Sequence, residues 1–381
     1  MRILLSGLMA GVPYQGGATW AVLQYLLGFK RLGHDVCFVE PVEAGALRPN
    51  GTDLAGSTNA AYFRSVVEQF ELAESAALLV KDTTETFGLS YSKLARIAAG
   101  ADVLFNISGM LTDERLLSRI PRRVYLDLDP AFIQIWHTQG IDMHLDGHTH
   151  FVTIARALGQ PDCHIPTCGR SWISTFQPVV LEHWPLAQHV RYNALTTVAN
   201  WRGYGSVEHE GVFYGQKAHS LRPFFALPRA SPLNFMLALA IHPGEAKDLQ
   251  ALRANGWELL DPAKVAGTPN AYREFVQTSM AEFGIAKSGY VAARSGWFSD
   301  RSTCYLASGR PVLAQETGFS HYLPVGEGLF RFSTMDDALE AIQELNRNYI
   351  RHAHAARALA EAYLDSDLVL SSLLERVGAV G

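Results

Sequence analysis

Short apolar runs alternate with amphipathic stretches from the first residues onward. Residues 2–8 are almost entirely apolar, which is typical of a strand buried on both faces of a parallel sheet. A glycine-containing loop at 11–17 leads into a stretch with helical apolar spacing that begins near Trp20 and ends at Gly33. A second apolar run covers residues 35–39. Strand, glycine loop, helix and strand within about 40 residues indicate a βαβ unit.

The same alternation continues and then restarts in the second half of the chain. Further strands are predicted at 102–107, 123–128, 151–154, 194–199, 235–241, 257–260, 285–291 and 311–314. Helices are predicted at 91–99, 111–120, 216–225, 245–255, 271–283, 302–308 and from 334 to the end. Strands that alternate with helices favour parallel sheets covered by helices on both faces.

Residues 176–192 interrupt this alternation. They contain Pro178 and Pro185 and have no regular apolar spacing, so we interpret them as a linker. A chain of 381 residues is long enough for two domains, at roughly 100–200 residues per domain. The expected fold class is therefore α/β, with two doubly wound Rossmann-like domains.

Composition and charge narrow the choice of partners. Hydrophobic residues make up 48% of the chain and charged residues 18%, which supplies apolar material for two cores and argues against disorder. The formal net charge is −5 and no long basic run is present, so a nucleic-acid partner is not expected. A small anionic ligand is compatible with this charge, because a few N–H groups and one or two arginines can bind it.

The start of the chain and its cysteines favour a cytoplasmic protein. Pro13 and Gln15 interrupt the first apolar run too early for a signal peptide. No run of about 18 apolar residues offers a membrane span. Four cysteines are too few for a disulfide scaffold in a chain of this length, so we expect reduced thiols.

The most informative motif lies within residues 295–339. A small residue and a glycine precede Pro-Val-Leu in the run Ala307–Leu313. Thr317 and Gly318 follow, and residues 326–329 read Gly-Glu-Gly-Leu. This order resembles the donor-binding half of GT-B glycosyltransferases of the group 1/family 4 type.

The resemblance implies how the chain is divided. The implied parts are an acceptor domain at 1–175, the linker at 176–192, a nucleotide-sugar donor domain at 193–347, and helices at 348–381 that pack back on the first domain. The two domains would face each other across a cleft. Gly16 and Gly17, ahead of a long apolar helix, are similar to the first loop of that fold, which approaches the donor phosphates from across the cleft.

The resemblance also implies an activity, with one departure from the pattern. It implies a hexosyltransferase-like enzyme that moves a sugar from a nucleotide-diphospho sugar, such as a UDP-sugar, to an unidentified small-molecule or glycan acceptor. Such enzymes generally work without a bound metal, so no cofactor is expected. Gly296 and Cys304 stand where the best-known retaining members have two glutamates eight residues apart. The carboxylate that usually binds the donor ribose is absent from that place or supplied by another residue. The resemblance therefore does not determine the identity of the donor, nor whether the transfer retains or inverts the configuration of the sugar.

Four residues open the predicted helix in the donor half. Asp300, Arg301, Ser302 and Thr303 precede its apolar residues, and Asp and Ser are favourable N-cap types. A helix N-terminus presents unpaired N–H groups and a partial positive charge, which suit a pyrophosphate. Arg301 would add a charge-assisted contact.

Other donor candidates follow predicted strands of the second half. Glu316, Thr317 and Gly318 come after a buried strand, where ligands bind in parallel sheets. Glu316 could accept hydrogen bonds from hydroxyl groups, and Gly318 would allow close approach of the backbone. Arg202 follows the first strand of the second half and could neutralise a leaving diphosphate, and Lys217 is a weaker candidate.

The acceptor must lose a proton as it attacks, which requires a base. Asp127 and Asp129 end a strand of the first half and point to the same side of it. Asp129 and His137 are the candidates for the base, and Asp127 could instead be a structural hydrogen-bond acceptor.

Three alternatives compete with this hypothesis. His144, His148 and His150 lie close in sequence to two aspartates, but Gly147 breaks the run, and a polar loop over the acceptor site is favoured over a metal site. Glycine spacing in the first loop does not fit the dinucleotide fingerprint, which argues against a nicotinamide dehydrogenase. A sugar-nucleotide epimerase of the same fold and a non-catalytic nucleotide-sugar-binding protein remain as alternatives.

Overall fold

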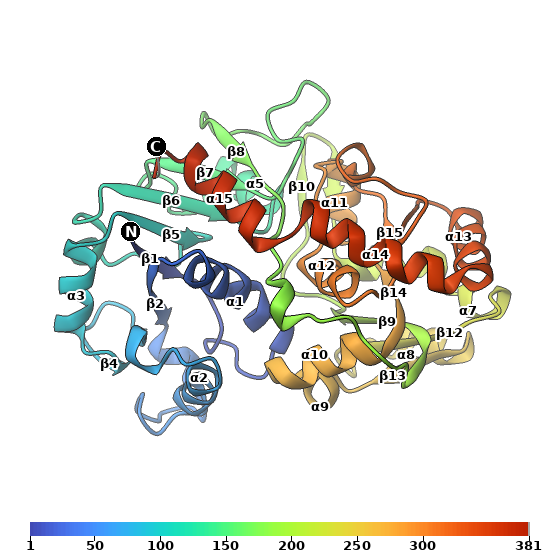
Figure 1. Ribbon diagram of the computed structural model, residues 1–381, viewed down its shortest axis with the longest axis horizontal. Helices are drawn as coiled ribbons and strands as arrows, with labels where there is room; N and C mark the ends of the chain where they lie inside the picture. Colours follow the sequence, from blue (N-terminus) through green and yellow to red (C-terminus); the bar gives the residue numbers. More distant parts are fainter. Residues whose placement is uncertain (380–381) are drawn as a thin grey trace.

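Each half of the chain forms one large sheet. The computed structural model describes residues 1–379. The first sheet has eight strands in the order β4-β3-β2-β1-β5-β6-β7-β8, and all neighbours are parallel except β3 and β4. The second has six parallel strands in the order β13-β12-β9-β14-β15-β16. The two sheets lie side by side with helices packed around both (Figure 1).

The first half contains these elements. Its strands are β1 (Arg2–Ser6), β2 (Asp35–Val42), β3 (Ala76–Val80), β4 (Thr86–Gly88), β5 (Val103–Ile107), β6 (Arg122–Asp127), β7 (His150–Thr153) and β8 (Trp172–Ser174). Its helices are α1 (Gly16–Arg31), α2 (Thr58–Gln69), α3 (Tyr91–Ala99), α4 (Glu114–Leu117) and α5 (Phe132–Thr138).

The second half follows a short connection. Its strands are β9 (Tyr192–Asn200), β12 (Asn234–Ala240), β13 (Trp257–Leu260), β14 (Ser279–Gly284), β15 (Val312–Gln315) and β16 (Leu329–Phe332), with a separate hairpin of β10 (Val207–His209) and β11 (Val212–Tyr214). Its helices are α6 (Lys217–Leu221), α7 (Leu227–Ala230), α8 (Ala246–Ala254), α9 (Pro262–Ala266), α10 (Pro269–Thr278), α11 (Ser288–Ala293), α12 (Asp300–Ala307) and α13 (Met335–Arg347). Helices α14 (Tyr349–Tyr363) and α15 (Ser366–Arg376) end the described chain.

The α/β fold class is confirmed, but two predicted elements around β14 are wrong. The predicted helix at 271–283 ends at Thr278, and the next six residues form β14 in the middle of the sheet. The predicted strand at 285–291 is instead mostly the helix α11. Residues 279–284 are all buried, and periodicity does not distinguish a buried strand from a buried helix over so short a run.

Other elements were shorter than predicted or were missed. The predicted helix at 111–120 contains only the four residues of α4. No element was predicted between β2 and α3, where the structure has α2, β3 and β4, nor at the hairpin of β10 and β11. The missed strands have three to five residues each, too few for a reliable alternation of polar and apolar positions.

The last two helices connect the two halves. Helix α14 packs against α12 of the second half, and α15 then crosses onto α1 of the first half (Figure 1). Arg31 Nε lies 3.0 Å from Asp367 Oδ1. A side chain at Gly28 would come within 2.5 Å of Leu370, so the absence of one allows α15 to lie close to α1.

The N-terminal end of α1 packs directly on the second half. A Cβ atom at Gly16 would lie 2.4 Å from the carbonyl oxygen of Thr268 and 2.6 Å from that of Ala266. Trp20 Nε1 donates a hydrogen bond of 2.8 Å to the Pro269 carbonyl. The indole of Trp20 also lies 4.9 Å from that of Trp184, between ring centroids. The largest apolar core therefore runs from the first half into the second without a break.

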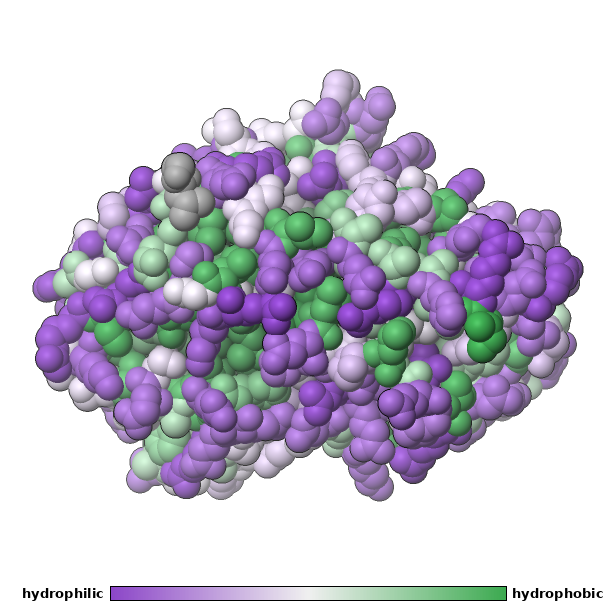
Figure 2. Space-filling view, in the orientation of Figure 1, coloured by the Kyte–Doolittle hydropathy of each residue, from purple (hydrophilic) through white to green (hydrophobic). Residues whose placement is uncertain are grey.

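One face of the molecule is mostly hydrophilic. On the face shown in Figure 2, hydrophilic residues predominate and hydrophobic residues form small separate patches. Within residues 1–379, none of the helices combines the length and the apolar character that a membrane crossing requires.

We predict that Gly16→Ala destabilises the protein. The added methyl group would press on the Thr268 and Ala266 carbonyls, which belong to backbone and cannot rotate away. Overpacking of this kind costs about 1–3 kcal/mol, to be measured by denaturant unfolding. Gly45→Ala is the matched control, because a Cβ atom there meets nothing within 4 Å. Equal stability of the two variants would contradict the close contact between α1 and the second half.

Candidate active site

The carboxyl ends of both sheets face the junction between the halves. Strand β6 of the first sheet ends at Asp127, and Asp129 follows it. Strand β14 of the second sheet ends at Gly284, and Lys287 follows it. Ligands of parallel α/β sheets bind beyond the carboxyl ends of strands, so this junction is the place to look for a site.

Asp129 is bound by three side chains of the second half. Lys287 Nζ lies 3.0 Å from Asp129 Oδ1 and 3.2 Å from Oδ2. The hydroxyl groups of Tyr204 and Tyr290 also donate hydrogen bonds to this carboxylate. The Lys287 ammonium lies over aromatic rings as well, 4.1 Å from the centroid of Tyr204 and 5.0 Å from that of Phe132. Burial lowers the pKa of Lys287, and the charge of Asp129 opposes that shift.

Asp127 positions the segment that contains Asp129. Its buried carboxylate accepts hydrogen bonds from Gln134 Nε2 at 2.7 Å, from Thr153 Oγ1 at 2.8 Å and from the Asp129 backbone N–H at 2.9 Å. Burial raises the pKa of Asp127 to about 6, against the effect of these hydrogen bonds. Asp127 thus joins β6, β7 and α5 and has the structural role that the sequence offered as its alternative.

His137 lies on α5, and its Nδ1 atom is buried without a hydrogen-bond partner. None of the hydrogen bonds described for residues 1–379 joins His137 to Asp129. The two candidate bases therefore sit in different surroundings.

Three cations gather in the second half beside Asp129. Lys217 opens α6 and is half-buried. Burial, together with the positive charges of Arg301 and Lys287, lowers the pKa of Lys217 to about 7. Like charges this close repel one another, so an anion placed among them would be stabilised by all three.

Arg301 has a buried partner of its own. Its Nε atom lies 2.5 Å from Glu282 Oε1, and its Nη1 atom donates to the Val198 carbonyl at 3.2 Å. The other carboxylate oxygen of Glu282 is buried and has no hydrogen-bond partner among the described residues. The Glu282 carboxylate holds the guanidinium in place under the start of α12.

The first turn of α12 borders a small cavity. Ser299 caps the helix by accepting a hydrogen bond from the Arg301 N–H. Arg301 and Ser302 line the cavity together with residues after β14 and β15. Thr303 is buried and donates to the Asp300 carbonyl at 2.6 Å, so its hydroxyl is used within the helix. Of the four residues predicted here, Arg301 and Ser302 line this cavity, and Asp300 is half-buried.

The turn after β15 is tied to the segment before α12. Thr317 Oγ1 donates to the Trp297 carbonyl at 2.5 Å, and the Thr317 carbonyl accepts the Gly296 N–H at 2.8 Å. Gly318 has a φ of +92°, and a Cβ atom there would lie 2.8 Å from the Arg294 carbonyl. Glu316 accepts the Gly318 N–H through one oxygen, and its other oxygen is buried without a partner.

Two sets of predicted residues lie away from this group of cations. Arg202 is paired with Glu245, at 2.5 Å between Nε and Oε1. Gly16 and Gly17 begin α1 rather than forming a loop, and they pack against the segment 266–272. Lys287, Tyr204 and Tyr290 were not among the predicted site residues. A correct boundary for β14 would have placed Lys287 just after a carboxyl strand end and identified it.

The histidines at 144–150 do not form a metal site. The His148 side chain bonds the His144 carbonyl at 2.9 Å and the Asn106 amide at 3.0 Å, and burial lowers its pKa to about 4. Among residues 1–379, no three or more His, Cys, Asp or Glu side chains are grouped so that they could hold a metal ion.

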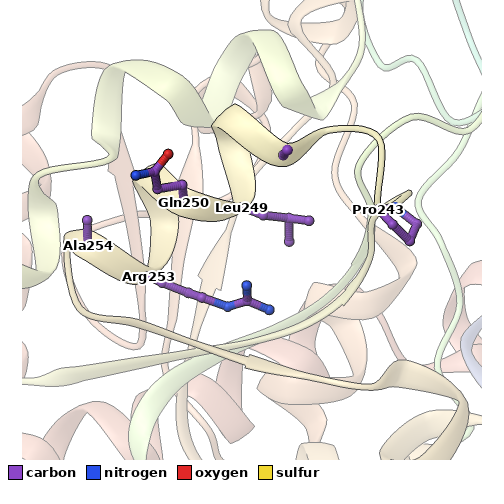
Figure 3. Close-up of a pocket in the computed structure, with 6 residues that line it drawn as sticks. Pro243, Leu249, Gln250, Arg253 and Ala254 are labelled. Atoms are coloured by element: carbon purple, nitrogen blue, oxygen red, sulfur yellow. The ribbon is translucent and has the colours of Figure 1, made fainter.

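A separate hollow of about 630 Å³ lies along α8 (Figure 3). Its lining comes from the single segment 243–254, with Leu249 and Arg253 turned to one side of the helix. A ligand site normally has polar groups that converge from several elements, so this hollow lacks the features of one.

Solved structures share this arrangement over the full length of the chain. An alpha-glucosyltransferase in complex with UDP has a TM-score of 0.60 and 12% identity, over 99% of this chain and 100% of that one. Anabaena HepE in complex with UDP-glucose has a TM-score of 0.58 and 13% identity, over 100% of both chains. The chain has the GT-B fold. The sequence matches no family model and no curated protein.

Another GT-B neighbour was solved with nucleic acid. An alpha-glucosyltransferase in complex with UDP and a 13-mer DNA containing a HMU base has a TM-score of 0.59 and 12% identity, over 99% of both chains. At this identity the likeness establishes the GT-B fold alone.

We predict that Lys287→Met destabilises the closed arrangement of the two GT-B domains. The change leaves the Asp129 carboxylate without its cation, and removing one partner of a partly buried charged pair costs about 1–3 kcal/mol. Denaturant unfolding measures this loss. Arg191→Met is the matched control, because it breaks an exposed ion pair with Glu274, worth about 0–1 kcal/mol. A Lys287→Met protein as stable as that control would contradict the role given to the Asp129 pair.

Proposed function

We propose that this GT-B protein is a glycosyltransferase that moves a sugar from a nucleotide-diphospho sugar, a UDP-sugar first of all, to an acceptor hydroxyl. The observation behind this proposal is the grouping of Lys217, Lys287 and Arg301 beside the start of α12, opposite the Asp129 carboxylate. The solved GT-B neighbours contain UDP or UDP-glucose, which is why a UDP-sugar is the first donor to test.

The diphosphate of the donor would lie against these cations. Two phosphates supply the negative charge that relieves the repulsion among Lys217, Lys287 and Arg301, and the first N–H groups of α12 add hydrogen bonds. The free oxygen of Glu316 is suited to accept a hydrogen bond from a sugar or ribose hydroxyl. Arg202 would join only after leaving Glu245, and Gly16 and Gly17 would act by fixing α1 against the donor domain.

Lys287 links the donor to the base. Its ammonium now binds Asp129, and a diphosphate beside it would compete for the same charge. As Lys287 turns to the phosphates, Asp129 regains free lone pairs, which a base needs to accept the proton of the acceptor hydroxyl. The base would thus become available after the donor has bound.

The acceptor is proposed to be a small molecule or a glycan. Neighbouring alpha-glucosyltransferase structures include DNA. This chain has a net charge of −5, and a duplex needs a row of cations to offset its phosphates. Small molecules and glycans are therefore the first acceptors to test, and DNA is the next.

We predict that UDP binding takes up a proton at pH 8. The pKa of Lys217 is lowered to about 7, so Lys217 is mostly neutral at pH 8 in the free protein. A bound diphosphate favours the charged form and raises that pKa, so affinity should fall by up to about tenfold per pH unit above 7. Calorimetry in buffers of different ionisation enthalpy measures the number of protons taken up when UDP binds. Lys217→Met should abolish the uptake, and exposed Lys247→Met should leave it intact.

The same preparation tests the enzymatic function itself. UDP-glucose incubated without acceptor should release UDP slowly, as water replaces the acceptor. Binding of UDP without any such release would favour the non-catalytic alternative, and isomerisation of the sugar on intact donor would favour an epimerase. Failure of UDP and the other common nucleoside diphosphates to bind would remove the proposal.

We predict that Asp129→Asn lowers turnover by about 10²–10⁴-fold. The amide keeps the shape of the side chain but cannot take the proton, and donor affinity should change far less than turnover. His137→Gln tests the rival base in parallel. Turnover near the original value in Asp129→Asn, with a large loss in His137→Gln, would transfer the role to His137.

A further inference from the structure

Arg156 follows β7, and its guanidinium has no anionic partner within residues 1–379. Arg156 lies with its guanidinium 4.4 Å from the ring centroid of Phe176 and 5.4 Å from that of Tyr322. Its Nη1 atom donates to the Ser174 carbonyl at 3.1 Å, and its Nε atom is buried without a partner. The two rings hold the planar group in one orientation, with donors left unused.

A second arginine reaches the same place from the other end of the chain. Arg376 closes α15, and its Nη1 atom donates to the same Ser174 carbonyl oxygen at 2.6 Å. Neither Arg156 nor Arg376 takes part in an ion pair within residues 1–379. Burial lowers the pKa of Arg156, and the nearby charge of Arg376 lowers it further. Two guanidinium groups that share one oxygen repel each other, and an anion between them would remove that repulsion.

The arginine pair lies at the domain junction. The backbone N–H of Ala157, next to Arg156, donates to the Ser295 carbonyl of the second domain at 2.8 Å. Tyr322 follows the turn that contains Glu316, the residue proposed to bind donor hydroxyls. A group bound by the arginines would therefore lie at the junction with the proposed donor half.

The pair is distinct from the proposed diphosphate site. The Arg156 guanidinium contacts Ser174, Phe176 and Tyr322. Lys287 instead binds Asp129, and Arg301 binds Glu282. The two groups of cations thus share no member. Two guanidinium forks match one phosphate or carboxylate group, which each can bind through two parallel hydrogen bonds.

We propose that Arg156 and Arg376 bind an anionic group, a phosphate or a carboxylate, on the acceptor. This inference rests on the proposed glycosyltransferase function. It narrows the acceptor to a molecule with a negative charge close to the hydroxyl that receives the sugar. The last helix of the chain would then contribute to acceptor choice, although the acceptor domain is otherwise built from the first half.

The test measures binding of acceptor analogues to protein saturated with UDP, so that the diphosphate site is filled. Glucose 6-phosphate supplies a phosphate, glucuronate a carboxylate and glucose no charge, and calorimetry compares the three. Arg156→Gln and Arg376→Gln are the variants. Arg64→Gln is the matched control, because Arg64 is an exposed arginine over the ring of Phe87, at 4.9 Å, in the same domain.

At least one anionic analogue should bind more tightly than glucose, and each variant should weaken it by about tenfold or more. The affinity for UDP should be unchanged in each variant. The control Arg64→Gln should bind the anionic analogues as tightly as the original protein does. Equal binding of glucose and both anions, or anion binding that both variants leave unchanged, would overturn the proposal. Arg376 is exposed, so Arg376→Gln should not disturb folding. It therefore tests the proposal even if Arg156→Gln does not fold.

Two further arms separate this inference from the function on which it rests. If UDP does not bind, the glycosyltransferase proposal fails, and titration of inorganic phosphate into the UDP-free protein still tests the arginine pair. Vesicles of phosphatidylglycerol test a lipid-borne phosphate, and binding that both variants abolish would assign the anion to a lipid headgroup. Vesicle binding that survives both variants would count against the pair.

Discussion

The carboxylate of Asp129 connects the two halves of the molecule. It belongs to the first half, yet it accepts hydrogen bonds from Lys287, Tyr204 and Tyr290 of the second half. A partly buried carboxylate needs such partners, because an unpaired charge in these surroundings is costly. The geometry of the cleft therefore depends on whether Lys287 stays with this carboxylate or moves to another anion.

The three cations Arg301, Lys287 and Lys217 differ in how they are paired with carboxylates. Glu282 binds Arg301 through one carboxylate oxygen, Asp129 binds Lys287, and Lys217 has no ion pair with a carboxylate within residues 1–379. An anionic ligand gains most from the cation that is least compensated, which in the proposed site would be Lys217. Burial is the main cause of the lowered pKa of Lys217, and the charges of Arg301 and Lys287 contribute in the same direction.

The sequence was sufficient for the fold, and it named part of the candidate site. Alternating apolar runs and the motif at 307–313 led to the GT-B fold, because strand order and glycine turns leave a trace along the chain. Asp129, Lys217 and Arg301 were named as candidates because each stands just after a strand or at the start of a helix. Their partners left no such trace: Glu282, which binds Arg301 within the second half, lies in the run 271–283 that was predicted to be a helix.

Helix α15 has a consequence for how the protein is made. It covers α1, including the space at Gly28 where Leu370 sits, yet it is separated from α1 in the sequence by the whole second half. At about 5–20 residues per second, roughly 20–70 s pass between the synthesis of α1 and that of α15. During this interval the apolar flank of α1 is open to chaperones or to other nascent chains. The first half is thus fully covered only after the second half has been made, and a chain truncated before Ser366 would expose this surface permanently.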